Sequence, residues 1–104
     1  MLEQIKKMKK KEFPLEIKRV LSALSQENRQ NIVMFLIYNN KMSFSDLMKN
    51  TNLNSSTLSF HLKTLMQASL IDNLYIKSDN PDKEYSYYEL TEFGKDFLHS
   101  IGFI

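Results

Sequence analysis

The sequence predicts an α+β fold in which several helices precede an antiparallel hairpin and one more helix ends the chain. Up to Ala68 the apolar residues recur every three or four positions, which is the spacing of a helix face. Segments 71–77 and 84–90 are instead rich in Ile, Leu and Tyr, and a turn-forming cluster separates them. With 104 residues, of which 42% are hydrophobic, the chain has the size and composition of one compact domain.

Composition argues against several classes of function. The chain has no cysteine, and its two histidines leave little for a His-based zinc centre. It contains no nucleophile paired with a base and no Gly-rich phosphate loop, so we expect no enzymatic activity, no cofactor and no metal. The longest apolar run, from Ile32 to Tyr38, is far shorter than a membrane span, and we expect a cytoplasmic protein without membrane contact.

Charge separates a basic N-terminal extension, residues 1–13, from a domain formed by residues 14–104. The first twenty residues hold seven basic and three acidic side chains, and five of these lysines fall within the first eleven positions. Such a cluster suits contact with a polyanion, and a solvated helix face explains it equally well. Leu2, Ile5 and Met8 recur among the lysines at the spacing of a short amphipathic helix.

Two helices open the domain. The first is expected to follow Pro14, which is well placed near a helix start. Ser25 is the expected N-cap of the second helix, which should end near Asn39 and Asn40. The buried sides of the two helices are expected to hold Ile17, Val20, Leu21 and Leu24, and Ile32, Val33, Leu36 and Ile37.

A short helix, a turn and a longer helix are expected next. Residues 43–44 are expected to form an extended link, and Ser45 to cap the short helix. Residues 50–52 are poor helix formers, and an Asn there can adopt the left-handed conformation that a tight turn needs. Asn54 is the candidate N-cap of the longer helix, which runs to about Ala68 and buries Leu58, Leu62 and Leu65.

The hairpin and a final helix complete the order. In the second strand Tyr88 and Leu90 share one face, and Tyr85 and Tyr87 share the other, so that one pair can cover the helices. Thr91 is the expected N-cap of the last helix. The apolar stripe of that helix holds Phe93, Phe97 and Ile101.

This order of elements is that of a winged helix-turn-helix domain with a two- or three-stranded antiparallel wing. Residues 45–71, SDLMKNTNLNSSTLSFHLKTLMQASLI, resemble the helix-turn-helix of ArsR-type transcriptional regulators, whose recognition helices show Ser-x-His-Leu-x-x-Leu. LSALSQENRQNIVMFL at 21–36, which contains Arg29, resembles the opening of that family's second helix, and YYELTEFG at 87–94 resembles its wing exit. The recognition-helix pattern is matched by Ser59, His61, Leu62 and Leu65.

The outward side of the helix after Asn54 is small and polar. With Leu58 as the inward direction and about 100° per residue, Ser56, Phe60, Lys63 and Gln67 fall on the opposite side. Such side chains can reach base edges or phosphates, although a solvated helix face has a similar composition. With the lysines of the wing, the expected DNA-binding residues are Asn54, Ser55, Ser56, Thr57, Ser59, Phe60, His61, Lys63, Gln67, Lys77 and Lys83.

Three features depart from the family or from a simple DNA surface. Phe60 stands where the family usually has Arg or another polar residue, so it suits either a thymine methyl or a protein interface. His61 lies at the boundary of the core, where a half-buried histidine with satisfied hydrogen bonds is the first expectation and a phosphate contact the second. The wing tip carries Asp79 and Asp82 beside its lysines, which weakens the basic wing contact that the resemblance implies.

Apolar residues at both ends of the chain favour a homodimer. The last twelve residues contain three Phe and two Ile, more than the core of so small a domain needs. The alternative is that the C-terminal helix folds over its own domain. Asp96 and His99 have the spacing of a metal-ligand pair, but a surface pair is the simpler interpretation. The expected dimer contacts, through the first and last helices, are Leu2, Ile5, Phe93, Phe97 and Ile101.

We therefore expect a regulator of transcription that binds a specific double-stranded DNA sequence, an inverted repeat, as a homodimer. The alternative is a winged-helix module that binds a protein partner and has no sequence-specific DNA binding. The acidic wing favours this alternative.

Overall fold

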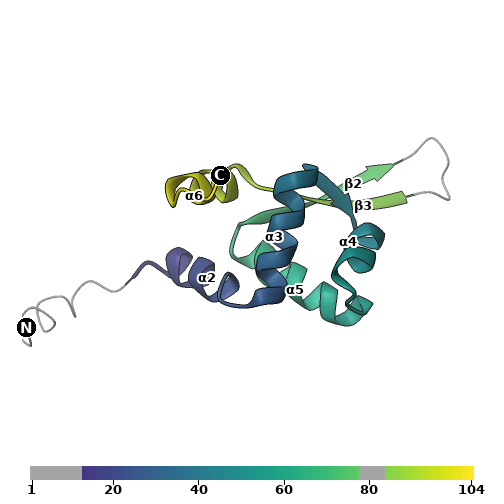
Figure 1. The fold of residues 1–104 in the computed structure, drawn as a ribbon, viewed down its shortest axis with the longest axis horizontal. Helices are drawn as coiled ribbons and strands as arrows, with labels where there is room; N and C mark the ends of the chain where they lie inside the picture. Colours follow the sequence, from purple (N-terminus) through teal and green to yellow (C-terminus); the bar gives the residue numbers. More distant parts are fainter. Residues whose placement is uncertain (1–12, 78–83) are drawn as a thin grey trace, which may run out of the picture.

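A computed structural model of the chain describes residues 13–77 and 84–104 and confirms the predicted α+β winged helix-turn-helix (Figure 1). The described part contains five helices and a three-stranded antiparallel sheet. In chain order the elements are α2 (Leu15–Ala23), α3 (Glu27–Asn39), β1 (Lys41–Ser43), α4 (Phe44–Thr51), α5 (Ser55–Gln67), β2 (Ile71–Lys77), β3 (Glu84–Leu90) and α6 (Glu92–Ser100). The proposed boundary between residues 13 and 14 stays a prediction, because residues 1–12 lie outside the described ranges.

The sheet has the strand order β1-β3-β2, with β3 in the centre. The hairpin strands have the predicted bounds, and Ile71 pairs with Leu90 at the end nearest the helices. The short strand β1 pairs Met42 with Tyr88. The sequence indicated only an extended link at residues 43–44, of which Ser43 ends β1 and Phe44 begins α4. Figure 1 shows the hairpin projecting from one end of the domain, while α2 and α6 lie at the other end.

Two of the four predicted helix caps are wrong by one or two residues. Ser43, the last residue of β1, accepts a hydrogen bond from the Asp46 N–H at 3.1 Å and caps α4, so the helix begins at Phe44 rather than after Ser45. Ser25 does not cap α3, because its hydroxyl donates to the Ser22 carbonyl at 2.7 Å instead. The residue before α3 is Gln26, which makes no side-chain capping bond.

The other two caps and the tight turns are confirmed. Asn54 accepts from the Thr57 N–H at 2.9 Å, and Thr91 accepts from the Gly94 N–H at 2.8 Å. Asn52 adopts the left-handed conformation (φ 60°) that the turn between α4 and α5 needs. Asn40 and Ser69 also have a φ of 60°, and these two residues end α3 and follow α5.

The core lies between the helices and one face of the sheet. Of the two pairs on the second hairpin strand, Tyr88 and Leu90 are the one buried against the helices, and Leu98 of α6 joins the same cluster with 4% of its surface exposed. A side chain at Gly94 would overlap the Leu70 carbonyl oxygen, so the start of α6 lies directly against the turn that follows α5. The last helix therefore completes the core of its own domain. This agrees in part with the alternative to dimerisation, in which the C-terminal helix folds over its own domain.

No helix in residues 13–77 and 84–104 combines the length and the hydrophobicity needed to cross a membrane.

Candidate nucleic-acid interface

Helices α4 and α5 and the turn between them form the helix-turn-helix. Leu58, Leu62 and Leu65, at the predicted helical spacing, are each at most 1% exposed and fix the inner side of α5 against the core. Leu53 packs against that core from the turn, and the left-handed Asn52 sets the direction in which α5 leaves. Because its inner side is fully buried, the rotation of α5 about its own axis is determined, and so is the set of residues that faces outward.

The outward side of α5 is the one that the sequence predicted. Phe60 is 61% exposed, which is unusual for a large apolar side chain. Its ring meets that of His61 edge to face, with 5.6 Å between centroids, so one side of the ring is held while the other faces solvent. The remaining exposed residues of this surface are Asn54, Ser55, Ser56, Ser59, Lys63 and Gln67, and Thr57 is half-buried.

The N-terminal turn of α5 differs from those of the other described helices. Helices α2, α3, α4 and α6 each carry an acidic residue in the first turn, whereas α5 has only hydroxyl side chains there. A carboxylate at that end would oppose the approach of a phosphate to the positive end of the helix dipole. The Ser56 hydroxyl already has a partner within this turn, since it donates to Asn54 Oδ1 at 3.0 Å.

His61 is a correction to the expected set of DNA contacts. Its side chain is 3% exposed, and its Nδ1 lies 3.1 Å from Nη1 of Arg29. Burial and the neighbouring guanidinium both lower the pKa of His61 below its ordinary value of 6.5. The neutral ring accepts a hydrogen bond from Arg29 at Nδ1 and is held in the core, so we remove His61 from the residues expected to touch a phosphate.

Arg29 is the structural residue whose role the sequence analysis missed. It is 9% exposed, and its Nε donates to the Ala23 carbonyl at 2.8 Å, at the C-terminal end of α2. A cation at that end of a helix is favoured by the helix dipole. Through its second bond, to His61, Arg29 connects the end of α2 with the middle of α5. The only signal in the sequence was its place in the segment 21–36, which resembles the opening of the family's second helix.

The described strands of the wing carry both basic and acidic residues. Lys77 ends β2 opposite Glu84 in the register, and Lys83 lies outside the described residues. Nearer the helices, Asp72 and Glu89 are directly opposite each other on β2 and β3, and Lys41 of β1 is the other neighbour of Glu89. The described strands therefore carry carboxylates of their own in addition to those at the tip.

The helices at the opposite end expose apolar side chains. Phe93 is 40% and Ile101 59% exposed on α6, and Leu15 and Leu21 of α2 are more than half exposed. Phe97, expected at a dimer contact, is partly buried against the core of its own domain, and its contact with a second copy stays a prediction. Of the other expected dimer contacts, Leu2 and Ile5 lie outside the described residues. Within the described ranges, no group of three His, Cys, Asp or Glu side chains could hold a metal ion.

Comparison with known proteins places this arrangement in a family. Residues 26–73 match the model described as bacterial regulatory protein, arsR family, which spans α3 to the start of β2. The helix-turn-helix core of this chain matches the ArsR family model. The resemblance seen in the sequence is thus confirmed, and the family is one of transcriptional regulators. No curated protein sequence matches the chain.

Solved structures agree on the ArsR-type fold. HlyU from Vibrio cholerae is 23% identical, with a TM-score of 0.64, over 83% of this chain and 87% of that one. The reduced form of the transcriptional regulator YodB from B. subtilis is 18% identical, with a TM-score of 0.69, over 86% and 84% of the two chains. A homodimeric winged helix-turn-helix DNA-binding domain from Mycobacterium bovis, a possible ArsR-family transcriptional regulator, is 19% identical, with a TM-score of 0.67, over 84% and 75%.

Proposed function

We propose that this chain is a sequence-specific regulator of transcription, which binds an inverted repeat in double-stranded DNA as a homodimer. One observation carries the proposal. The outward side of α5 is small and polar around an exposed Phe60, while buried leucines fix the helix from behind. A helix whose rotation is determined and whose outer residues are short can enter a major groove closely.

Each outward residue type has a role at a DNA groove. Ser56, Ser59 and Gln67 can donate to or accept from base edges and phosphates, and Lys63 can neutralise one phosphate. Phe60 can contact the methyl group of a thymine, which is the apolar feature of the major groove. The first turn of α5, free of carboxylates, can approach the DNA backbone.

The distribution of charge predicts modest non-specific affinity. Carboxylates on the wing oppose phosphates, and the lysines of residues 1–13 supply positive charge that the wing lacks. Specific contacts from α5 then account for a larger part of the binding energy than they would beside a basic wing. A cytoplasmic location is part of the proposal, because the family that the helix-turn-helix matches is one of DNA-binding regulators.

The homodimer is supported by apolar surface on α2 and α6. Leu15, Leu21 and Ile101 are each more than half exposed, and Phe103 and Ile104 beyond α6 are 52% and 47% exposed. Pairing of two copies about a two-fold axis would cover these side chains. It would also set the two α5 helices about one turn of DNA, roughly 34 Å, apart, and the bound sequence would then be an inverted repeat.

Selection of bound sequences from random duplex DNA by the purified protein tests the proposal. We expect an enriched motif with two-fold symmetry. Absence of any enriched motif would contradict sequence-specific binding, and a motif without symmetry would contradict the symmetric dimer.

A protein-interaction module is the second candidate, and the exposure of Phe60 is the observation that favours it. The two functions respond differently to salt. Binding to DNA phosphates weakens steeply as ionic strength rises, whereas an apolar protein interface changes little.

A further inference from the structure

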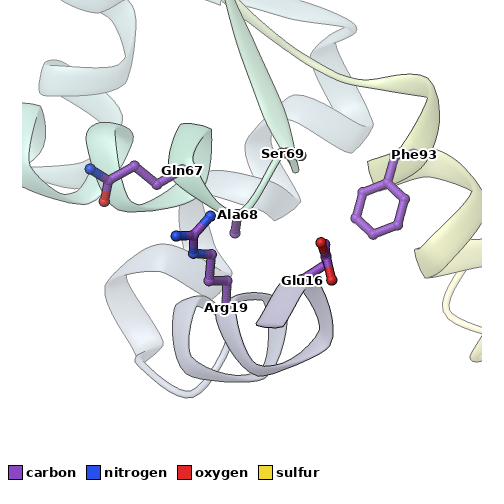
Figure 2. Close-up of a pocket in the computed structure, with 6 residues that line it drawn as sticks. All are labelled: Glu16, Arg19, Gln67, Ala68, Ser69 and Phe93. Atoms are coloured by element: carbon purple, nitrogen blue, oxygen red, sulfur yellow. The ribbon is translucent and has the colours of Figure 1, made fainter. Parts of the chain in front are cut away.

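A hollow lies where α2, the end of α5 and the start of α6 meet, away from the outward side of α5 (Figure 2). It has a volume of about 240 Å³ and is lined by Glu16, Arg19, Gln67, Ala68, Ser69 and Phe93. A second hollow, of about 410 Å³, adjoins it along the groove between α2 and α5 and shares three of these residues. The space is sufficient for a molecule of several non-hydrogen atoms.

The first hollow brings together two opposite charges that are not paired with each other. The side chains of Glu16 and Arg19 form no hydrogen bond or ion pair with another residue in ranges 13–77 and 84–104. Both side chains rise from the same helix, yet Figure 2 shows them diverging. The guanidinium of Arg19 points toward Gln67 and Ala68, and the carboxylate of Glu16 points toward the ring of Phe93.

The two ends of the hollow therefore favour opposite charges on a ligand. Near Arg19, the guanidinium is a hydrogen-bond donor suited to a carboxylate, and Figure 2 shows the amide of Gln67 turned away from it. Near Glu16, the carboxylate attracts an ammonium group, and the Phe93 ring beside it gives that end of the hollow an apolar wall. A simple anion would meet Glu16 and a simple cation would meet Arg19, so each would be opposed by one of the two side chains.

We propose that this hollow binds a small zwitterion whose ammonium and carboxylate groups are separated by a short apolar chain. The carboxylate lies at Arg19, the ammonium lies at Glu16, and the chain between them runs past Ala68. Neither charged residue of the site is among the proposed DNA contacts, and Gln67 is the one lining residue that the hollow shares with the outward surface of α5.

Three probes of equal carbon number test the charge requirement: 4-aminobutyrate, butyrate and butylamine. Each is titrated into the DNA-free protein, and amide chemical shifts are followed by NMR. We expect 4-aminobutyrate to give saturable shifts at Gln67, Ala68 and Ser69 with a Kd of about 1 mM, typical of so small a ligand. Butyrate and butylamine, each lacking one favourable contact, are expected to bind about fivefold more weakly.

Two variants are expected to remove the preference for the zwitterion over one of the singly charged probes. They should leave the core intact, because both side chains are exposed. Glu16→Gln is expected to bind butyrate and 4-aminobutyrate with equal affinity. Arg19→Gln is expected to bind butylamine and 4-aminobutyrate with equal affinity. Glu27→Gln is the matched control, an exposed carboxylate in the first turn of α3 that does not line the hollow, and it should leave all three affinities unchanged.

Several results would overturn the proposal: no saturable shift with 4-aminobutyrate, equal affinity of the unaltered protein for butyrate, or shifts away from the end of α5. A hollow filled by a second copy of the chain would give the first of these results. Failure of the protein to bind DNA would leave this titration unaffected, because no DNA is present.

Discussion

Lowering the pH is expected to destabilise the fold through His61. The pKa of His61 is lowered in the folded protein, first by burial and then by Arg29, so the unfolded chain binds a proton more readily than the folded one. The contribution of His61 to the free energy of unfolding is therefore at its full value above the unfolded pKa of about 6.5. It falls as the pH drops below that value, until the folded pKa is reached. For one proton the slope cannot exceed about 1.4 kcal/mol per pH unit.

Urea unfolding at a series of pH values from neutral to mildly acidic measures this effect. The matched variant is His61→Gln, because the Gln carbonyl oxygen can accept the Arg29 hydrogen bond but does not titrate. Subtracting the variant's free energy of unfolding from that of the unaltered protein removes the contributions of all other groups. We expect the difference to decline below pH 6.5. Parallel curves for the two proteins would refute the reasoning.

Four further predictions follow from the fold and the proposed function. Ser69→Gly should raise the free energy of unfolding by up to about 1 kcal/mol, since Gly adopts a positive φ without strain, and a loss of stability in denaturant melts would contradict this. Gly94→Ala should lower the free energy of unfolding by about 1–3 kcal/mol, because the added Cβ would overlap the Leu70 carbonyl. A gain of about 1 kcal/mol, which is usual when Ala replaces a Gly inside a helix, would show that the turn can move. Lys63→Ala should weaken binding to all duplexes alike and reduce the slope of log affinity against log salt concentration by about one. Phe60→Ala should lose most affinity on the preferred sequence, and equal losses of affinity on random DNA would show that Phe60 only packs against the helix. Ile101→Lys should convert the dimer into a 12.3 kDa monomer in sedimentation experiments, while the control Tyr38→Lys, at a still more exposed apolar side chain of α3, leaves it intact. A dimer that survives the first change would contradict pairing through the end of α6.

The sequence predicted best those features that depend on neighbouring residues. The spacing of Leu58, Leu62 and Leu65 determined which side of α5 is inward, and the change to a period of two gave the bounds of both hairpin strands. Asn54 and Thr91 were correctly identified as caps because each precedes an unambiguous helical stripe. These elements are sufficient to define the helix-turn-helix and its outward surface.

The failures concern contacts between distant segments. Whether Ser43 or Ser45 caps α4 depends on where β1 ends, and β1 exists only because it pairs with Tyr87 and its neighbours on β3. In the same way, helical periodicity placed His61 at an edge of the core. Its burial depends on Arg29, which approaches from another helix and hydrogen-bonds to it. Tertiary hydrogen bonds of this kind leave no periodic trace in the sequence.

Thr91 has a consequence for how the chain reaches this structure. Its N–H donates to the Leu70 carbonyl at 3.0 Å and its hydroxyl donates to the Ser69 carbonyl at 2.5 Å, while that hydroxyl also caps α6. A hairpin paired one residue out of register would place a different residue at that turn and would turn every side chain of one strand to the opposite face. Docking of α6 therefore requires the correct register of β2 and β3. We expect the final helix to form its native contacts late in folding, after the local contacts of the helix-turn-helix and the non-local pairing of the hairpin.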